Sequence, residues 1–160
     1  MNCTIKRFYL SLFLICFSAV LYSSSPGDLD TTFDTDGYLV DANAFEISDV
    51  LQQSDGKIIV VGVDATENSV YVARYLSSGA LDTAGFNSGG TPGYLVDTNG
   101  GAAHGIALQS DGKIVVAGVD SAGNSVYVAR YTAAGVLDTA GFNSGGTPGY
   151  IVDTNGSEAY

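Results

Sequence analysis

The sequence contains very few of the residues that build metal centres or carry out thiol chemistry. Its 160 residues include one histidine, no tryptophan and two cysteines, Cys3 and Cys16. The chain after residue 16 therefore has no disulfide and must be stabilised by apolar packing and backbone pairing. Zinc sites, iron–sulfur sites and a cysteine nucleophile are excluded there, because each needs cysteine or several clustered ligands.

Positive charge is also scarce. Six lysines and arginines stand against 17 aspartates and glutamates, which gives a formal net charge of −11. Only Lys57, Arg74, Lys113 and Arg130 lie beyond residue 25, so this part has no basic patch. Nucleic acids and anionic membrane surfaces would repel such a chain. We therefore expect no nucleic-acid partner.

The one long apolar run lies at the N-terminus. A basic start at Lys6 and Arg7 precedes the run from Phe8 to Tyr22, and small residues follow it. This order is typical of a secretory signal peptide, and the run is shorter than the ~20 residues of a membrane-spanning helix. We expect residues 1–25 to be a signal peptide, with an uncleaved anchor as the alternative. The product would be secreted, periplasmic or on the cell surface, without stable membrane insertion.

Repetition is what the chain has in abundance. The stretch "SDGKIIVVGVDATENSVYVARY" from Ser54 returns nearly unchanged from Ser110, 56 positions later. "GYLVD" at Gly37 and Gly93 returns as "GYIVD" at Gly149 with the same spacing. Such self-similarity indicates a repeat architecture. The predicted organisation is a partial unit at 26–40, full units at 41–96 and 97–152, and the start of a truncated unit at 153–160.

Each unit is predicted to contain four short strands. In the second full unit they are 105–109, 113–119, 125–131 and 150–153. Asp111-Gly112 is a tight-hairpin signal in which both central residues must tolerate positive φ. β-branched residues on both faces of 113–119 indicate a strand that is buried on both sides. In the next strand the side chains alternate, with Val126, Val128 and Arg130 on one face and Tyr127, Ala129 and Tyr131 on the other.

Tandem units of four short antiparallel strands are typical of β-propeller blades. Each unit hides an apolar face only against its neighbour, which explains why the same residues recur. We expect an all-β fold of four-stranded antiparallel blades from an incomplete β-propeller, with about two and a half repeats of 56 residues. A β-solenoid or a duplicated sandwich is the alternative. Because closed propellers have about 4–8 blades, we expect a fragment of a longer protein or self-association.

The motifs "DGKIVVAG", "VARY", "GVLD" and "GY.V" resemble the delta-60 repeat. The resemblance extends from about Gly27 onward, and the first unit matches it at Phe33 and Gly37. Later copies depart from it, with extra Gly, Ser and Pro around Phe86 and Phe142. The resemblance implies a β-propeller in a secreted or surface-associated bacterial protein, with no established activity and no catalytic residues.

The few chemistry-bearing residues form no clear catalytic set. His104 has no second histidine to share a metal, and we expect it at a surface strand edge. "DTDG" at 34–37 matches part of a calcium loop but lacks the closing glutamate, so we expect a turn. Weak calcium binding there is kept as a hypothesis, with the ligands Asp28, Asp30, Asp34 and Asp36.

The remaining polar positions have ordinary structural explanations. Asp64 with Asn68, and Asp120 with Asn124, have the spacing of turns in which the aspartate bonds nearby backbone. "GFNSGG" at 85–90 and 141–146 is neither a phosphate loop nor a nucleophile elbow, so we expect a turn-rich connection. Arg74 and Arg130 are predicted to bond neighbouring groups, with Asp82 and Asp138 as partners.

No catalytic, cofactor-binding or metal-binding residue is therefore predicted. The function we expect is a non-catalytic secreted or surface-associated module with a structural role or a protein or glycan partner. The alternative is part of a propeller enzyme that acts on glycans, in which site residues differ between blades. The feature that supports this alternative is that two equivalent stretches, Ala42–Gln53 and Thr98–Gln109, differ in sequence.

Overall fold

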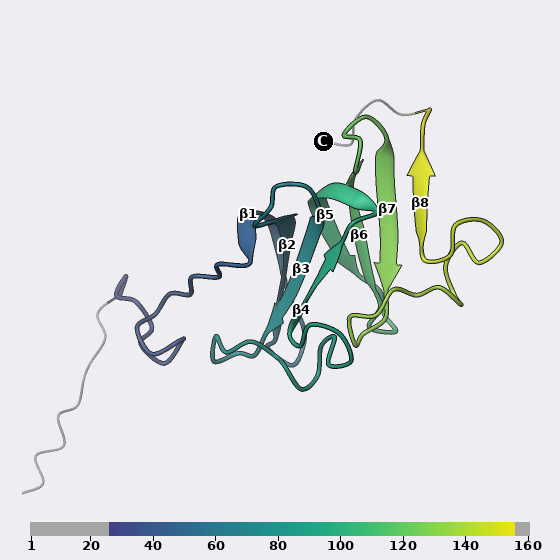
Figure 1. Ribbon diagram of the computed structural model, residues 1–160. Coiled ribbons are helices and arrows are strands. Elements are labelled where there is room, and N and C mark those ends of the chain that lie inside the picture. The colour runs from purple at the N-terminus through teal and green to yellow at the C-terminus, as the bar shows by residue number, and fades with distance from the viewer. Residues whose placement is uncertain (1–25, 156–160) are drawn as a thin grey trace, which may run out of the picture.

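A computed structural model describes residues 26–155 of the protein (Figure 1). The expected signal peptide at 1–25 and the last residues of the expected truncated unit, 156–160, lie outside the described residues. Residues 26–155 contain no helix of the length and apolar character needed to cross a membrane.

Two four-stranded antiparallel sheets follow one another along the chain (Figure 1). Blade 1 consists of β1 (Ala44–Gln52), β2 (Ile58–Asp64), β3 (Val70–Tyr75) and β4 (Tyr94–Asp97). Blade 2 consists of β5 (Gly100–Leu108), β6 (Ile114–Asp120), β7 (Val126–Tyr131) and β8 (Tyr150–Asp153). Each strand pairs with the next one in sequence. The predicted all-β architecture of four-stranded blades from an incomplete propeller is confirmed.

The first strand of each blade is longer than the sequence predicts. The strand expected at 105–109 begins at Gly100 instead, and Gly100 pairs with Asp120 of β6. Two irregularities interrupt this pairing, one between Gly100 and Ala102 and one between Ala103 and Gly105. Bulges shift side chains from one face to the other, so the regular alternation that marks a strand is lost here. β1 shows the same pair of irregularities.

The connection from β5 to β6 also differs from the prediction. It is wider than a two-residue hairpin, since the Gln109 N–H donates to the Lys113 carbonyl at 2.8 Å. Of its residues only Gly112 has a positive φ, at 81°, so the prediction of two such residues was wrong. A longer loop that contains one left-handed residue needs glycine at that residue alone.

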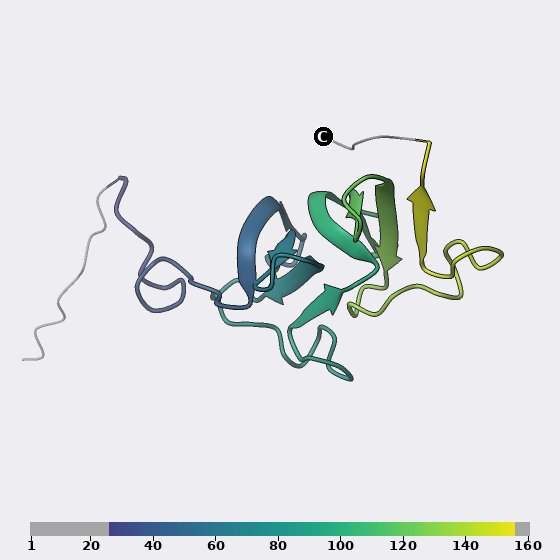
Figure 2. The same cartoon turned by 45° about the horizontal axis from the view of Figure 1, so that its top comes forward.

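The two blades stack face to face, and the larger core cluster lies between them (Figure 2). Blade 1 contributes buried side chains from β2, β3, β4 and the loop before β4. Blade 2 contributes residues of β5, β6 and β7. The cluster comprises Ile59, Val61, Val70, Val72, Phe86 and Leu95 of blade 1, and Ala103, Ile114, Val116, Tyr127, Ala129 and Tyr131 of blade 2.

The outer faces of the pair are less well covered. All six residues of β3 are buried, whereas β7 alternates between buried and half-buried residues. The strand predicted to be buried on both sides, β6, is fully buried only on the face that carries Ile114 and Val116. Its other face is half exposed because no blade packs on it within residues 26–155. On the opposite side of blade 1, Leu39 of the N-terminal segment packs against Tyr71, Ala73 and Tyr75.

Candidate functional site

A cluster of hydrogen-bonded polar side chains between the blades is built around Asp97, the last residue of β4. The hydroxyls of Tyr127 and Tyr131 on β7 each donate to Asp97 Oδ2 at 2.7 Å. Asp97 Oδ1 accepts from the backbone N–H of Asn99 at 3.0 Å and from its side-chain Nδ2 at 2.7 Å. Four donors thus compensate a buried carboxylate, which would otherwise be costly to desolvate. We call this arrangement, one aspartate with two tyrosines, the inter-blade clasp.

The same clasp occurs one unit earlier. Tyr71 donates to Asp41 Oδ2 at 2.6 Å, and Tyr75 donates to the same oxygen. Asp41 Oδ1 accepts from the Asn43 backbone N–H at 2.9 Å and from Nδ2 at 2.8 Å. Burial acts to raise the pKa of Asp41, but these hydrogen bonds outweigh it and hold the pKa below its ordinary value. The N-terminal segment therefore contacts blade 1 as blade 1 contacts blade 2.

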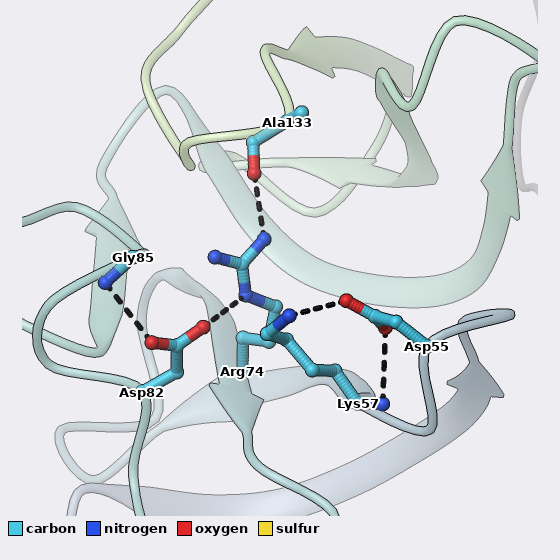
Figure 3. Close-up of polar contacts among 6 residues, drawn as sticks. All are labelled: Asp55, Lys57, Arg74, Asp82, Gly85 and Ala133. Carbon is cyan, nitrogen blue, oxygen red and sulfur yellow. Dashed lines mark hydrogen bonds and ion pairs between the residues drawn. The ribbon is translucent and has the colours of Figure 1, made fainter.

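Arg74 forms a second polar link between the blades (Figure 3). Its Nε donates to Asp82 Oδ2 at 2.8 Å, which is the predicted partner, and its Nη1 donates across the interface to the Ala133 carbonyl at 2.7 Å. Asp82 Oδ1 accepts from the Gly85 N–H at 3.0 Å. This ion pair is almost fully buried, unlike the exposed Asp55–Lys57 pair drawn beside it. An exposed pair of that kind adds little stability.

The glycine-rich stretch at 85–90 provides a third link. Phe86 is fully buried and covers Gly135 of blade 2, where an added Cβ would lie 2.6 Å from the phenyl ring. The Asn87 N–H donates to the Ala134 carbonyl at 2.7 Å. This stretch is therefore an ordered packing element, and the lack of a side chain at Gly135 is what admits the ring.

Blade 2 repeats, on its outer face, the residues that blade 1 contributes to these links. Arg130 pairs with Asp138 at 2.8 Å, and its guanidinium lies 5.0 Å from the centre of the Phe142 ring. Asp153 Oδ1 accepts from the Asn155 N–H at 2.8 Å and from Nδ2 at 2.9 Å. Within residues 26–155, Asp153 Oδ2 accepts no hydrogen bond from a tyrosine.

A groove of about 450 Å³ opens beside the clasp between the two blades. Polar groups line one part of it and aliphatic side chains line another. Its walls include Asn87, Thr91, Asn99, Val96, Val136 and Leu137. A smaller groove of about 200 Å³ occupies the equivalent place one unit earlier, beside Asp41 and Tyr75.

The other candidate residues lie apart from this interface. His104 is exposed on β5, an edge strand of its sheet. In the part of the chain that the structure describes, no three His, Cys, Asp or Glu residues are grouped to hold a metal.

The aspartates of the N-terminal segment bond to nearby protein groups. Asp30 accepts hydrogen bonds from Thr32, and the backbone N–H of Asp34 donates to the Ser78 carbonyl. Asp36 accepts from the Tyr38 N–H.

The aspartates at the turns between the second and third strands of each blade bond nearby backbone, as their spacing indicates. Asp64 Oδ1 accepts from the N–H groups of Asn68 at 3.1 Å and Ser69 at 2.9 Å. Asp120 Oδ1 makes the equivalent contacts with Asn124 and Ser125, both at 3.0 Å.

The clasp was not among the contacts predicted from the sequence, although its signal is present there. Asp41, Asp97 and Asp153 recur at intervals of 56 residues, and two tyrosines four positions apart recur in "YVARY". Residues four apart in a strand lie on one face, so the tyrosine pair was a sign of a shared acceptor.

Stacked four-stranded sheets joined by links that repeat from unit to unit define the chain as a β-propeller repeat domain without a closed ring. A family model described as "Domain of unknown function (DUF5122) beta-propeller" matches residues 53–84 and 109–140. The two matched segments contain β2 with β3, and β6 with β7, so the chain is similar to this propeller family in the central strands of both blades. No curated protein and no solved structure matches the chain.

Proposed function

We propose that the protein is a non-catalytic repeat module of the delta-60 kind, secreted or on the bacterial cell surface, that binds a glycan or a protein. The observation that carries the proposal is the use of its buried charges. Arg74, Asp82 and Asp97 all bond to groups within or between blades. Their partners hold the blades together, which leaves these groups committed to structure rather than to proton transfer.

The groove between the blades is the binding surface that we propose. Its volume of about 450 Å³ lies within the range of small-ligand sites. The side-chain oxygens of Asn87 and Asn99 and the hydroxyl of Thr91 offer hydrogen bonds, since the Nδ2 groups of both asparagines are bonded within the protein. Val136 and Leu137 offer apolar contact. This mixture suits a sugar ring, which presents hydroxyls at its edge and C–H groups on its faces.

The proposed location rests on the signal-like segment at residues 1–25. Expression of the full gene in a bacterium, followed by mass spectrometry of the exported product, tests it. We expect a mature N-terminus near Ser23 to Ser25. A product that retains Met1 in the cytoplasm would contradict this location.

A glycan array combined with a hydrolysis screen tests the proposed activity on the full chain. We expect bound sugar without cleavage products. Val136→Asp should abolish binding, because Val136 lines the groove and 55% of it is exposed, so that folding tolerates the change. Leu76→Asp is the matched control, since Leu76 is exposed outside the groove. Cleaved sugar would favour the propeller-enzyme alternative, and binding that survives Val136→Asp would refute the groove as the site.

A further inference from the structure

The accepting half of the clasp, an aspartate with the asparagine two residues later, occurs three times in the chain. Asp97 and Asp153 end β4 and β8, and Asp41 lies 56 positions before Asp97 in the N-terminal segment. Each accepts two hydrogen bonds at Oδ1 from the asparagine two residues later. In the first two copies Oδ2 receives two tyrosine hydroxyls of the following unit. In the third copy the carboxylate is oriented by the same asparagine contacts. It ends β8, the yellow strand on the side of blade 2 away from blade 1 (Figure 2).

The surface around Asp153 matches the surface that blade 1 buries against blade 2. We call it the donor face, and it consists of Val126, Val128, Arg130, Phe142, Ile151 and Asp153. The stretch 137–150 is identical in sequence to 81–94, and "VYVARY" occurs in both blades. Phe142 is half-buried where its equivalent Phe86 is fully buried. The donor face thus repeats the equivalent residues of blade 1 with one change, Ile151 for Leu95, and beside it Val115 and Ala117 stand where blade 1 has Ile59 and Val61.

The tyrosine half of the clasp, which donates the hydrogen bonds, is present at the other end of the molecule. We call it the receptor face, and it consists of Ile47, Val60, Tyr71, Ala73, Tyr75 and Gly79, each 56 positions before a blade 2 residue on the interface. The segment Leu29–Asp41, here the N-terminal cap, lies on this face (Figure 1). Its Asp34 N–H donates to the Ser78 carbonyl at 2.8 Å, as the Asn87 N–H does to Ala134.

The cap covers the receptor face only in part. Ile47 remains 44% exposed, whereas its equivalent Ala103 on blade 2 is fully buried. Phe45 and Val50 of β1 are also exposed. A whole blade would bury this apolar surface, so it would gain hydrophobic stabilisation that the cap does not supply.

We propose that the donor face of one copy docks on the receptor face of a second copy, in place of that copy's N-terminal cap, and joins the chains head to tail. The occupant is a second copy because both halves of an interface already used between the blades are carried by one chain. Asp153 binds Tyr71 and Tyr75 of the next copy, and Arg130 donates to its Ser77 carbonyl, the position equivalent to Ala133. Such a heterologous contact builds rings or open chains.

This association extends the proposed interaction role. Its test measures only contact between copies, so the association can fail while ligand binding in the groove holds, and the reverse. Each copy carries a formal net charge of −11, so the copies repel one another at long range. Added salt shortens the range of that repulsion. We therefore expect association to strengthen as the salt concentration rises.

A mixing experiment with two full-length variants tests the head-to-tail arrangement. Asp153→Ala removes the carboxylate of the donor face but keeps the receptor face. Ile47→Asp places a charge on the receptor face, at a side chain that the cap leaves 44% exposed and that docking would bury, but keeps the donor face. By analytical ultracentrifugation we expect the wild-type protein to self-associate, and each variant alone to do so at least about tenfold more weakly. An equal mixture should form a one-to-one complex, because the unchanged donor face of one variant can dock on the unchanged receptor face of the other.

Asp41→Ala supplies an independent check, because it removes the acceptor through which the cap holds Tyr71 and Tyr75. We expect this variant to associate about tenfold more tightly than the wild type. Circular dichroism melts establish that the variants are folded, and Ile47→Asn replaces Ile47→Asp if that one is not. A monomeric wild type in about 0.5 M salt, variants that associate as the wild type does, or a mixture without the one-to-one complex would each overturn the proposal.

Discussion

At the scale of single residues, the four clasp tyrosines have the most unusual environment in the described part of the chain. Burial is the main reason that the pKa of Tyr71 and of Tyr75 lies far above the ordinary value, and the charge of Asp41 adds to it. Burial and the charge of Asp97 raise the pKa of Tyr127 and Tyr131 in the same direction. These hydroxyls stay protonated because ionisation would place a second negative charge beside a carboxylate.

This environment predicts how stability changes in alkali. A group whose pKa is raised in the folded state contributes stability that is present below its unfolded pKa, about 10 for tyrosine, and that is lost as the pH rises above it. We expect the four clasp tyrosines to ionise only when the protein unfolds, out of ten tyrosines in the sequence. Ultraviolet absorbance and circular dichroism, recorded together during titration, should change in one step for these four. Ionisation of all tyrosines near pH 10 with intact sheets would contradict this expectation.

Arg74 and Arg130 offer a matched pair at the same scale. Arg74→Leu should lower the free energy of unfolding by about 3 kcal/mol, because it leaves Asp82 buried without its ion pair and removes the bond to Ala133. Arg130→Leu should cost about 1 kcal/mol less, since it breaks the pair with Asp138 but no bond to another blade within residues 26–155. Urea denaturation measures both. Equal losses would show that the contact across the interface contributes nothing.

At the scale of the strands, the bulges in β1 and β5 bring backbone unusually close to the second strand. A Cβ added at Gly118 in β6 would lie 1.9 Å from the Ala102 carbonyl oxygen, and Gly62 in β2 has the same relation to Glu46. These glycines are required by close approach of backbone rather than by positive φ, since neither has a positive φ.

Gly118→Ala therefore should destabilise blade 2 by about 2 kcal/mol or more, because the backbone of β5 must move away to admit the methyl group. Gly145→Ala is the matched control, since nothing lies within 4 Å of its added Cβ. Thermal melts followed by circular dichroism compare the two. A Gly118→Ala protein as stable as the control would mean that the bulge does not hold these strands together.

At the scale of the whole molecule, stability depends on the contact between blades. Phe86→Ala removes a fully buried ring that covers Gly135 and should cost about 3 kcal/mol or more. Phe142→Ala changes the same residue type in the same local sequence but at the half-buried outer face, and should cost about 1 kcal/mol. Chemical denaturation measures the difference. Similar losses would indicate that the ring stabilises its own loop rather than the stacking of blades.

Local signals in the sequence determined much of each blade. Short runs of β-branched and aromatic residues between turn signals placed three of the four strands of the second unit within one residue of β6, β7 and β8. The ion pairs of Arg74 and Arg130 followed from the same reasoning, because their partners lie only eight residues away in sequence. The 56-residue repeat determined the tandem arrangement, because each blade must present the same face to its neighbour.

The tertiary structure alone decided the contacts that join one unit to another. Asp97 and Tyr127 are 30 residues apart, and Arg74 and Ala133 are 59 apart, so no local pattern brings them together. The start of β5 at Gly100 was likewise decided by pairing with β6 across two bulges, which removes the alternation that sequence reasoning needs. The Asp97 carboxylate meets the tyrosine hydroxyls of blade 2 only when the two sheets stack, so this contact depends on both blades having formed.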